Sequence, residues 1–282
     1  MEEPKSKAKR GAKTAAAAQE DKITLLPLSE LHDFPNHPFK VRDDEAMQET
    51  AESIRQYGVL VPAIVRPRED GGYEIIAGHR RRHGSELAGL SAMPCIVRQM
   101  DDDTATILMV DSNIQRENIL PSERAQAYKM KLEAMKRQGQ RTDLTSSPLD
   151  NKLSGTTSAQ QLSQKSGDSQ PQIYRFIRLT ELIPPVLQMV DDGKIAFRPA
   201  VELSYLSKDQ QQSLHDTMEC EDCTPSLAQA IKMKEFSKDG RLTDEVILSI
   251  MQEEKPNQKE QFKMPKERIS KYFAPGTPAQ KI

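Results

Sequence analysis

The sequence predicts an α+β fold, in which a small mixed α/β domain is followed by a region built from helices alone. Between residues 23 and 97, short apolar and β-branched stretches alternate with segments whose apolar residues recur every three or four positions. From residue 121 onward the helical spacing dominates. At 282 residues the chain is long enough for one or two domains joined by linkers.

The first domain is expected over residues 23–120, after a polar, small-residue-rich tail at 1–22 that is expected to be disordered. Asp43 or Asp44 is placed to cap a helix that ends at Gly58. Around this helix we expect strands at 23–26, 59–66, 73–77 and 93–97, and further helices at 79–89 and 104–112. The turn Glu69–Gly72 makes the strands at 59–66 and 73–77 neighbours.

Three consecutive carboxylates, Asp101 to Asp103, precede the helix expected at 104–112. Negative charge is favourable at the N-terminus of a helix, so they are interpreted as a cap. The alternative is a metal-binding triad.

The later part of the chain is expected to form four segments. These are a connecting basic helix at 121–138, a polar Ser/Thr-rich linker at 139–156, a helix-turn-helix domain at 157–206 and a helical C-terminal region with a flexible end at 207–282. The basic helix can lie along a phosphate backbone or form a solvated face, and its cations are Arg124, Lys129, Lys131, Lys136 and Arg137.

The helix-turn-helix is predicted from a helix that opens at Ser158, stops at Gly167 and is followed by a second helix over Gln170–Leu182. The outer face of the second helix is rich in groups that suit base edges and phosphates, with Arg175 and Gln172 the first choices for base contacts. The residues of this face are Gln170, Gln172, Tyr174, Arg175 and Arg178. The alternative is a helical hairpin whose polar face meets water.

The segment Ala77–Arg82 follows a predicted strand and begins a predicted helix. Gly78 lets the backbone turn sharply, and the amide groups at the start of the helix can face an anion that Arg80 and Arg81 attract. This pattern suits a bound phosphate. Alone, it fits a solvated basic helix start better.

Two more segments favour the phosphate site over a solvated helix start: Gly58–Arg66 upstream and Asp111–Glu117 downstream. In order, spacing and residue types, the three segments resemble the nucleotide boxes of the ParB family of bacterial DNA-partition proteins. The resemblance covers residues 23–206 and implies a ParB/sulfiredoxin-like N-terminal domain ahead of the helix-turn-helix. It suggests a member of the plasmid or mobile-element type.

The resemblance implies that the first domain binds CTP with Mg²⁺, and that Asn113 also contacts the metal. The positions that match the family's boxes are Arg66, Gly78, His79, Arg80, Arg81, Ser112, Asn113 and Arg116. The family usually has Glu where this chain has His79 and Ser112. Because Mg²⁺ prefers carboxylate oxygens, these two differences should weaken metal binding or alter hydrolysis. Nucleotide binding is expected, weak CTP hydrolysis is left open, and no catalytic residue is assigned.

The family resemblance further implies a homodimer that recognises palindromic, centromere-like double-stranded DNA and uses CTP to close a clamp. A partition ATPase could bind the tail at 1–22, and the protein would act in the cytoplasm on nucleoid or plasmid DNA. The alternative is a helix-turn-helix transcriptional regulator with a degenerate nucleotide site.

Net charge, cysteine content and hydropathy limit the other kinds of protein and site that this sequence can form. The formal net charge of −2 provides no global attraction to DNA, so binding must come from local basic faces. Three cysteines fit a reducing compartment, and Cys220-x-x-Cys223 lacks the second ligand pair of a structural zinc site. No apolar run reaches the roughly 20 residues of a membrane span, and the tail does not resemble a signal peptide.

The sequence also argues against two enzyme classes. A sulfiredoxin-like enzyme would need a cysteine in the phosphate motif, but the nearest, Cys95, lies in a predicted strand. A nuclease would need a metal cluster or an acid and base pair, and none is evident.

Overall fold

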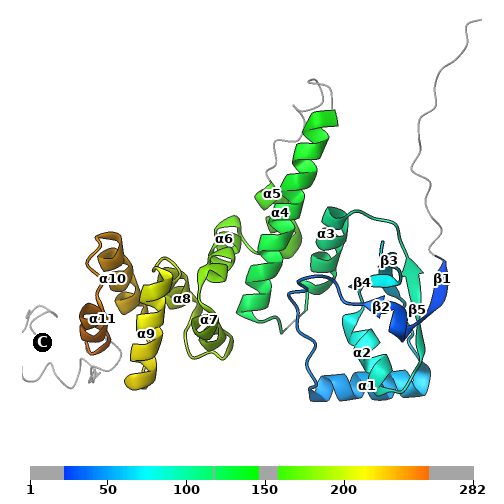
Figure 1. The fold of residues 1–282 in the computed structure, drawn as a ribbon, viewed down its shortest axis with the longest axis horizontal. Coiled ribbons are helices and arrows are strands. Elements are labelled where there is room, and N and C mark those ends of the chain that lie inside the picture. The colour runs from blue at the N-terminus through cyan, green and yellow to red at the C-terminus, as the bar shows by residue number, and fades with distance from the viewer. Residues whose placement is uncertain (1–21, 117, 146–157, 254–282) are drawn as a thin grey trace, which may run out of the picture. The chain divides into compact units, whose positions relative to one another are not determined.

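The computed structural model describes residues 22–116, 118–145 and 158–253 (Figure 1). Its contacts divide the chain into two compact units, Met1–Ile119 with Gln126–Ile173, and Leu120–Ala125 with Tyr174–Ile282. Residues 1–21 of the predicted tail lie outside the described residues. So do residues 146–156 of the predicted linker and residues 254–282 of the predicted C-terminal region.

The first unit holds a five-stranded sheet in the order β1-β5-β3-β4-β2. Antiparallel pairs join β1 to β5 and β3 to β4, whereas β3 and β5, and β2 and β4, are parallel. The strands are β1 (Ile23–Pro27), β2 (Leu31–His32), β3 (Ala63–Pro67), β4 (Tyr73–Ala77) and β5 (Ala92–Val97). The strands expected at 59–66 and 73–77, observed as β3 and β4, are therefore neighbours as predicted.

Alternation along β4 shows how the sheet forms two cores. Ile75 packs with Leu31, Met93 and other apolar residues in one cluster, whereas its neighbour Ile76 packs in a second cluster with Met109. Successive side chains of a strand point to opposite faces, so a run of apolar residues buries both faces of the sheet. Both isoleucines are fully buried.

The helices of this unit are α1 (Glu45–Tyr57), α2 (His79–Leu87), α3 (Asp102–Asn113), most of α4 (Pro121–Thr145), α5 (Ser158–Ser166) and the start of α6 (Gln170–Arg178). A 3-10 turn, η1, spans Leu28–Glu30. The cap of α1 is Asp44, whose Oδ1 accepts a hydrogen bond from the Met47 amide at 2.9 Å. Gly58 ends α1 with a φ of +72°, as predicted.

The second unit is helical in its described residues. It contains the end of α6, the 3-10 turn η3 (Leu179–Glu181), α7 (Pro184–Asp191), α8 (Phe197–Leu203), α9 (Lys208–Cys220), α10 (Leu227–Lys238) and α11 (Asp244–Met251). Ser207 and Ser226 begin α9 and α10 with reciprocal side-chain and backbone hydrogen bonds, one satisfied pair at each helix start. The α+β expectation is confirmed.

Three predicted boundaries were wrong. The strand expected at 59–66 begins only at Ala63, because Pro62 has no amide to donate to a ladder. The helix expected to end at Leu182 gives way to η3 after Arg178. The basic helix continues past Gly139 to Thr145, so the first seven residues of the predicted linker are helical.

No helix in the part of the chain that the structure describes is both long and apolar enough to cross a membrane.

Candidate nucleotide and DNA sites

Gly78 joins β4 to α2 in a conformation that requires glycine. Its φ is +125°, and a Cβ at this position would lie 2.8 Å from the Cβ of Ala63, the first residue of β3. A side chain here would be strained and would collide with the neighbouring strand. The first and second nucleotide-box segments therefore meet at backbone distance.

Arg81 holds these two segments together. Its Nη1 donates hydrogen bonds of 2.6 Å to the carbonyl oxygens of both Val61 and Pro62. Burial lowers the pKa of this guanidinium, which nevertheless stays protonated as arginines in proteins do. Arg81 thus points at the loop before β3 rather than into bulk water.

Carboxylates lie beside the other basic residues of α2. Nη2 of Arg80 lies 3.9 Å from Asp44, and Nη1 of Arg82 lies 3.0 Å from Asp33. His83 contacts Asp43 at 2.5 Å. Arg80 has the loosest of these contacts, so it is the arginine of this helix most easily turned toward an anion.

His79 is the exception on α2. The residue is only 5% exposed, and neither ring nitrogen has a hydrogen-bond partner. Its ring lies against that of His37, with 3.8 Å between the ring centroids. Burial, followed by the charges of His37, Arg116 and Arg82, lowers the pKa of His79 to about 3.

His37 is fixed by the backbone. Its Nδ1 lies 2.7 Å from the carbonyl oxygen of Phe39, which can only accept, so this nitrogen carries the proton. Its Nε2 is buried without a partner. Burial lowers the pKa of this histidine as well, since it outweighs the hydrogen bond to Phe39.

The third segment reaches the same place at the end of α3. The charge of Arg116 acts on both His37 and His79, and its guanidinium carbon lies 5.9 Å from the centroid of the Phe39 ring. Asn113 is buried and donates to the Met109 carbonyl oxygen at 2.8 Å and to Ser112 Oγ at 3.2 Å. All three segments therefore meet around the start of α2, but the first segment contributes Val61, Pro62 and Ala63 there rather than the predicted Arg66.

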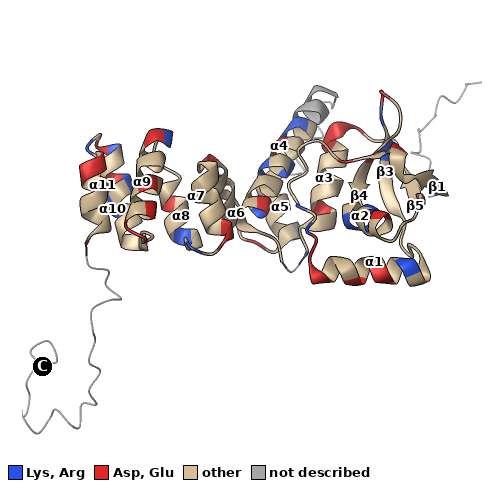
Figure 2. Ribbon diagram, turned by 60° about the horizontal axis from the view of Figure 1, so that its bottom comes forward, with Lys and Arg blue, Asp and Glu red and all other residues tan. Residues whose placement is uncertain are grey.

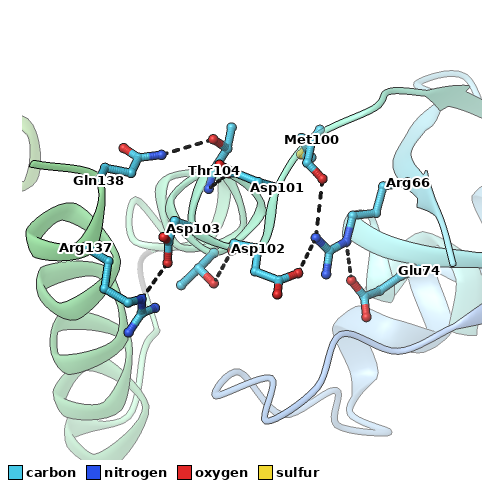
Figure 3. Close-up of polar contacts among 10 residues, drawn as sticks. Arg66, Glu74, Met100, Asp101, Asp102, Asp103, Thr104, Arg137 and Gln138 are labelled. Carbon is cyan, nitrogen blue, oxygen red and sulfur yellow. Dashed lines mark hydrogen bonds and ion pairs between the residues drawn. The ribbon is translucent and has the colours of Figure 1, made fainter. Parts of the chain in front are cut away.

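Arg66 lies elsewhere. The strand register places it opposite Glu74, whereas Ile64 is opposite Ala77, so Arg66 is at the far end of β4 from Gly78. Its guanidinium contacts Glu74 at 2.6 Å, Asp102 at 2.7 Å and the Met100 carbonyl oxygen at 3.4 Å (Figure 3). Burial alone would lower its pKa, but the bonds to Asp102 and Glu74 outweigh burial and raise it.

The three carboxylates of 101–103 have three different tasks (Figure 3). Asp101 accepts from the Thr104 amide at 2.8 Å and caps α3, Asp102 pairs with Arg66, and Asp103 contacts Arg137 at 2.7 Å. Side chains directed at separate partners do not converge on an ion. The capping interpretation is confirmed for Asp101, whereas Asp102 and Asp103 are the first two residues of α3 and pair with arginines.

The predicted helix-turn-helix is present as α5, a turn at Gly167 with φ of +77°, and α6. Leu162 and Ile173 are fully buried and supply apolar contacts on the inner faces of the two helices. Asp168 in the turn accepts a hydrogen bond from Tyr128 Oη at 2.5 Å, which ties the turn to α4.

The outer face of α6 is only partly as predicted. Tyr174 is 49% exposed and Arg175 is exposed, while Gln170 and Gln172 are half-buried. Arg178 instead turns back onto its own unit: its Nε donates to Ser204 Oγ at 3.2 Å, and its guanidinium carbon lies 4.2 Å from the Tyr205 ring centroid. Arg178 is half-buried, because the turn after α8 provides partners for it.

Sequence reasoning missed Arg198. This exposed residue of α8 shares a groove of about 240 Å³ with Arg175 of α6. The residues lie 23 positions apart, so no local pattern could join them. The sequence offered Arg198 only as a single cation within the segment 157–206 expected to form the helix-turn-helix domain.

Lys and Arg residues recur along α4 (Figure 2), but several of their side chains contact other residues of the fold. Lys131 is 1% exposed and pairs with Asp111, and Arg137 pairs with Asp103. The guanidinium carbon of Arg124 lies 5.3 Å from the Phe176 ring centroid. These three contacts favour a structural role for much of the positive charge of this helix.

Comparison with known families agrees with this architecture. Residues 12–114 match the model of the ParB N-terminal domain, and residues 151–225 match that of the ParB HTH domain. The chain belongs to the ParB family.

Relatives of this ParB chain carry different names. It is 33% identical over 177 residues to stage 0 sporulation protein J of Bacillus subtilis, covering 63% of this chain and 55% of that protein. It is also 33% identical over 192 residues to a nucleoid occlusion protein of Halalkalibacterium halodurans, covering 68% and 60%. The chain thus spans little more than half the length of such curated relatives.

Solved ParB structures show partial overlap. A C-terminally truncated ParB of Caulobacter crescentus, complexed to the centromeric parS site, has a TM-score of 0.44 and 21% identity over 75% of this chain and 98% of that one. The same protein complexed with CTP-gamma-S has a TM-score of 0.32 and 25% identity over 70% and 99%.

The cysteines of this ParB chain do not form a reactive centre around Gly78. Cys95 is buried in β5, and burial raises the pKa of its thiol to about 11. This agrees with setting the sulfiredoxin-like alternative aside. Cys223 lines a cavity of about 720 Å³ that also contains His215 and Glu219, on the opposite unit from Gly78.

Proposed function

We propose that this chain is a partition protein that recognises a specific double-stranded DNA site through α6 and uses CTP as a switch. The observation that carries the proposal is the convergence of three separated segments at the start of α2: Arg81 bonded to Val61 and Pro62, and Arg116 acting on His79. Membership of the ParB family supports it.

For the nucleotide, the proposal assigns phosphate contacts to the backbone at Gly78 and to Arg80 and Arg116. His79 is a further phosphate contact, and Arg81 shapes the site by holding the loop before β3. Ser112 and Asn113 support the end of α3 through their bonds to each other and to Met109. Arg66 is assigned no nucleotide contact; it stabilises the fold by pairing with Glu74 and Asp102.

Mg²⁺ does not fit this set of donors well. Mg²⁺ prefers oxygen ligands and holds a near-octahedral geometry. The buried side-chain atoms without hydrogen-bond partners on or beside α2 are nitrogens, of His79, His37 and Arg82. The carboxylates Asp33, Asp43 and Asp44 lie against basic side chains of the same helix. The amide of Asn113 is the one metal contact that the family resemblance suggested.

For DNA, the proposal assigns base contacts to Arg175 and Gln172 and further contacts to Gln170 and Tyr174. Arg198 is added as a phosphate contact because it shares a groove with Arg175. Arg178 positions α6 rather than touching DNA. A palindromic site read by a homodimer is the arrangement that a helix-turn-helix protein uses.

In this proposal CTP closes two N-terminal domains around DNA, and hydrolysis, if it occurs, only resets the clamp. A nucleotide can shift open and closed populations only by its different affinity for them. The protein would act in the cytoplasm on nucleoid or plasmid DNA. A partition ATPase would bind the tail at 1–22, nearly all of which lies outside the described residues.

Calorimetric titration of the full chain with CTP tests the nucleotide site. Arg80→Ala should weaken binding by roughly tenfold, because a charge-assisted bond to phosphate is lost. Arg68→Ala is a matched control, since Arg68 sits on the turn after β3 and contacts Asp70 at 3.7 Å. Undetectable CTP binding by the unmodified chain would contradict the proposal.

A transcriptional regulator with a degenerate nucleotide site remains the second candidate, and His79 and Ser112 favour it because both replace the family's usual carboxylates. Footprinting on closed circular DNA with and without CTP separates the two. A partition clamp should load at its site and spread over neighbouring DNA when CTP is present. A regulator should protect the same site alone in both conditions.

A further inference from the structure

The pair His37 and His79 is the most unusual polar feature of the first unit. Buried polar groups in proteins are almost always hydrogen-bonded, because an unpaired group loses its contacts with water and gains nothing. Here three imidazole nitrogens, both of His79 and Nε2 of His37, are buried without a partner. A ligand group is the partner that such a site lacks.

The surroundings define the charge of that ligand. Arg82 and Arg116 are the arginines whose charges act on His79. His79 is the first residue of α2, a nine-residue helix whose first amide groups add partial positive charge. Two cations, a helix start and the unpartnered N–H of the His79 imidazole together suit an oxyanion.

His37 is a positioning residue in this arrangement. Its Nδ1 is committed to the Phe39 carbonyl oxygen, and its ring stacks on His79 at 3.8 Å between centroids. Stacking holds the His79 ring in one orientation. His79 is therefore the ring that is left to donate a hydrogen bond to an oxyanion.

We propose that this site binds a nucleoside triphosphate in its metal-free form, with His79 donating to a phosphate oxygen where a carboxylate would need a bridging divalent cation. This inference rests on the proposed function, since it concerns the same nucleotide site. A carboxylate beside a phosphate repels it unless a metal ion lies between them. An imidazole N–H attracts the phosphate directly, so the ion becomes dispensable.

The experiment is a calorimetric titration of the full chain with CTP, once with Mg²⁺ and once with EDTA. The affinity of the unmodified chain should differ by less than about threefold between the two conditions, since direct donors replace the ion. His79→Glu should bind at least about tenfold more weakly in EDTA than in Mg²⁺, because it restores a like charge beside the phosphate.

Two further variants make the test specific. His79→Gln keeps a neutral donor and should stay independent of Mg²⁺ while binding more weakly overall. His83→Gln is the matched control, because His83 lies on the same helix but contacts Asp43 and Glu86 at the surface. It should behave as the unmodified chain does. Circular dichroism melts identify any variant that fails to fold, and the unmodified chain alone still tests Mg²⁺ dependence.

The outcomes separate this inference from the proposed function. Binding of CTP only in the presence of Mg²⁺ would overturn the inference and leave the proposed function standing. The absence of binding in both conditions would overturn both. If a folded His79→Glu variant also bound CTP equally well with EDTA, His79 would not be the group that replaces the metal ion.

Discussion

Arg66 and His79 lie toward opposite ends of β4, and both are largely buried polar residues predicted to meet a nucleotide. Arg66 is surrounded by Glu74, Asp102 and the Met100 carbonyl oxygen. His79 has no hydrogen-bond partner at either nitrogen. A satisfied buried group stabilises the fold, whereas an unsatisfied one costs stability and marks a place where a ligand can compensate.

The largest expected effect is the loss of stability on removing Arg66, the residue whose hydrogen bonds and ion pairs are complete. Arg66→Ala leaves Glu74, a 5% exposed residue, without its ion-pair partner. Breaking a buried pair on one side destabilises by about 3–5 kcal/mol. Urea unfolding measures this, with Arg68→Ala as the control for loss of a more exposed arginine. CTP affinity per folded molecule should be preserved, and a selective loss of CTP binding at unchanged stability would reverse the roles assigned to the two residues.

The second prediction concerns how the stability of the chain changes as the pH is lowered. The pKa of His79 is about 3 in the folded chain and near 6.5 when unfolded, so between these values the unfolded state binds a proton that the folded state excludes. Stability is then fully present above about pH 6.5 and falls as the pH drops, by up to about 1.4 kcal/mol per unit from this residue.

His79→Asn should flatten this acid slope, measured as the free energy of unfolding in urea between neutral and mildly acidic pH. His37, whose pKa is also lowered, keeps part of it. An equal slope in His79→Asn and the unmodified chain would show that His79 titrates freely in the folded state.

A third prediction carries the comparison to α6, where Arg175 is exposed and Arg178 is bonded to Ser204. Arg175→Ala should weaken specific DNA binding by roughly tenfold, about 1.4 kcal/mol, with little effect on stability. Arg178→Ala should chiefly lower the melting temperature. Fluorescence anisotropy with specific and scrambled duplexes measures the first effect, and the opposite assignment would follow if only Arg178→Ala lost specificity.

The smallest effect is expected from Lys136→Ala on the exposed part of α4. Surface substitutions of this kind change stability by less than about 0.5 kcal/mol. If this lysine contacts a phosphate, the slope of log affinity against log salt should fall by about one. An unchanged slope would assign the remaining charge of this helix to solvent.

Much of the architecture was accessible from the chain alone. Tyr73–Ala77 and Ser158–Ser166 were predicted as a strand and a helix at or near their observed bounds, because apolar spacing and glycine stops act over a few residues. The boundary errors fell where a local pattern was ambiguous. Residues 59–62 are apolar like a strand but contain Pro62, and Gly139 interrupts α4 in sequence without ending the helix.

The sequence by itself determined which residues are basic, which are apolar and where a backbone can turn, and these properties are local. Only the tertiary structure decided that Arg66 and Arg178 form ion pairs or hydrogen bonds within the protein, while the ring nitrogens of His79 have no hydrogen-bond partner. Partner choice depends on distances between residues far apart in the chain, such as Arg178 and Ser204. The chemistry of a side chain determines which hydrogen bonds it can form. Packing determines which of these form within the protein and which are left for a ligand.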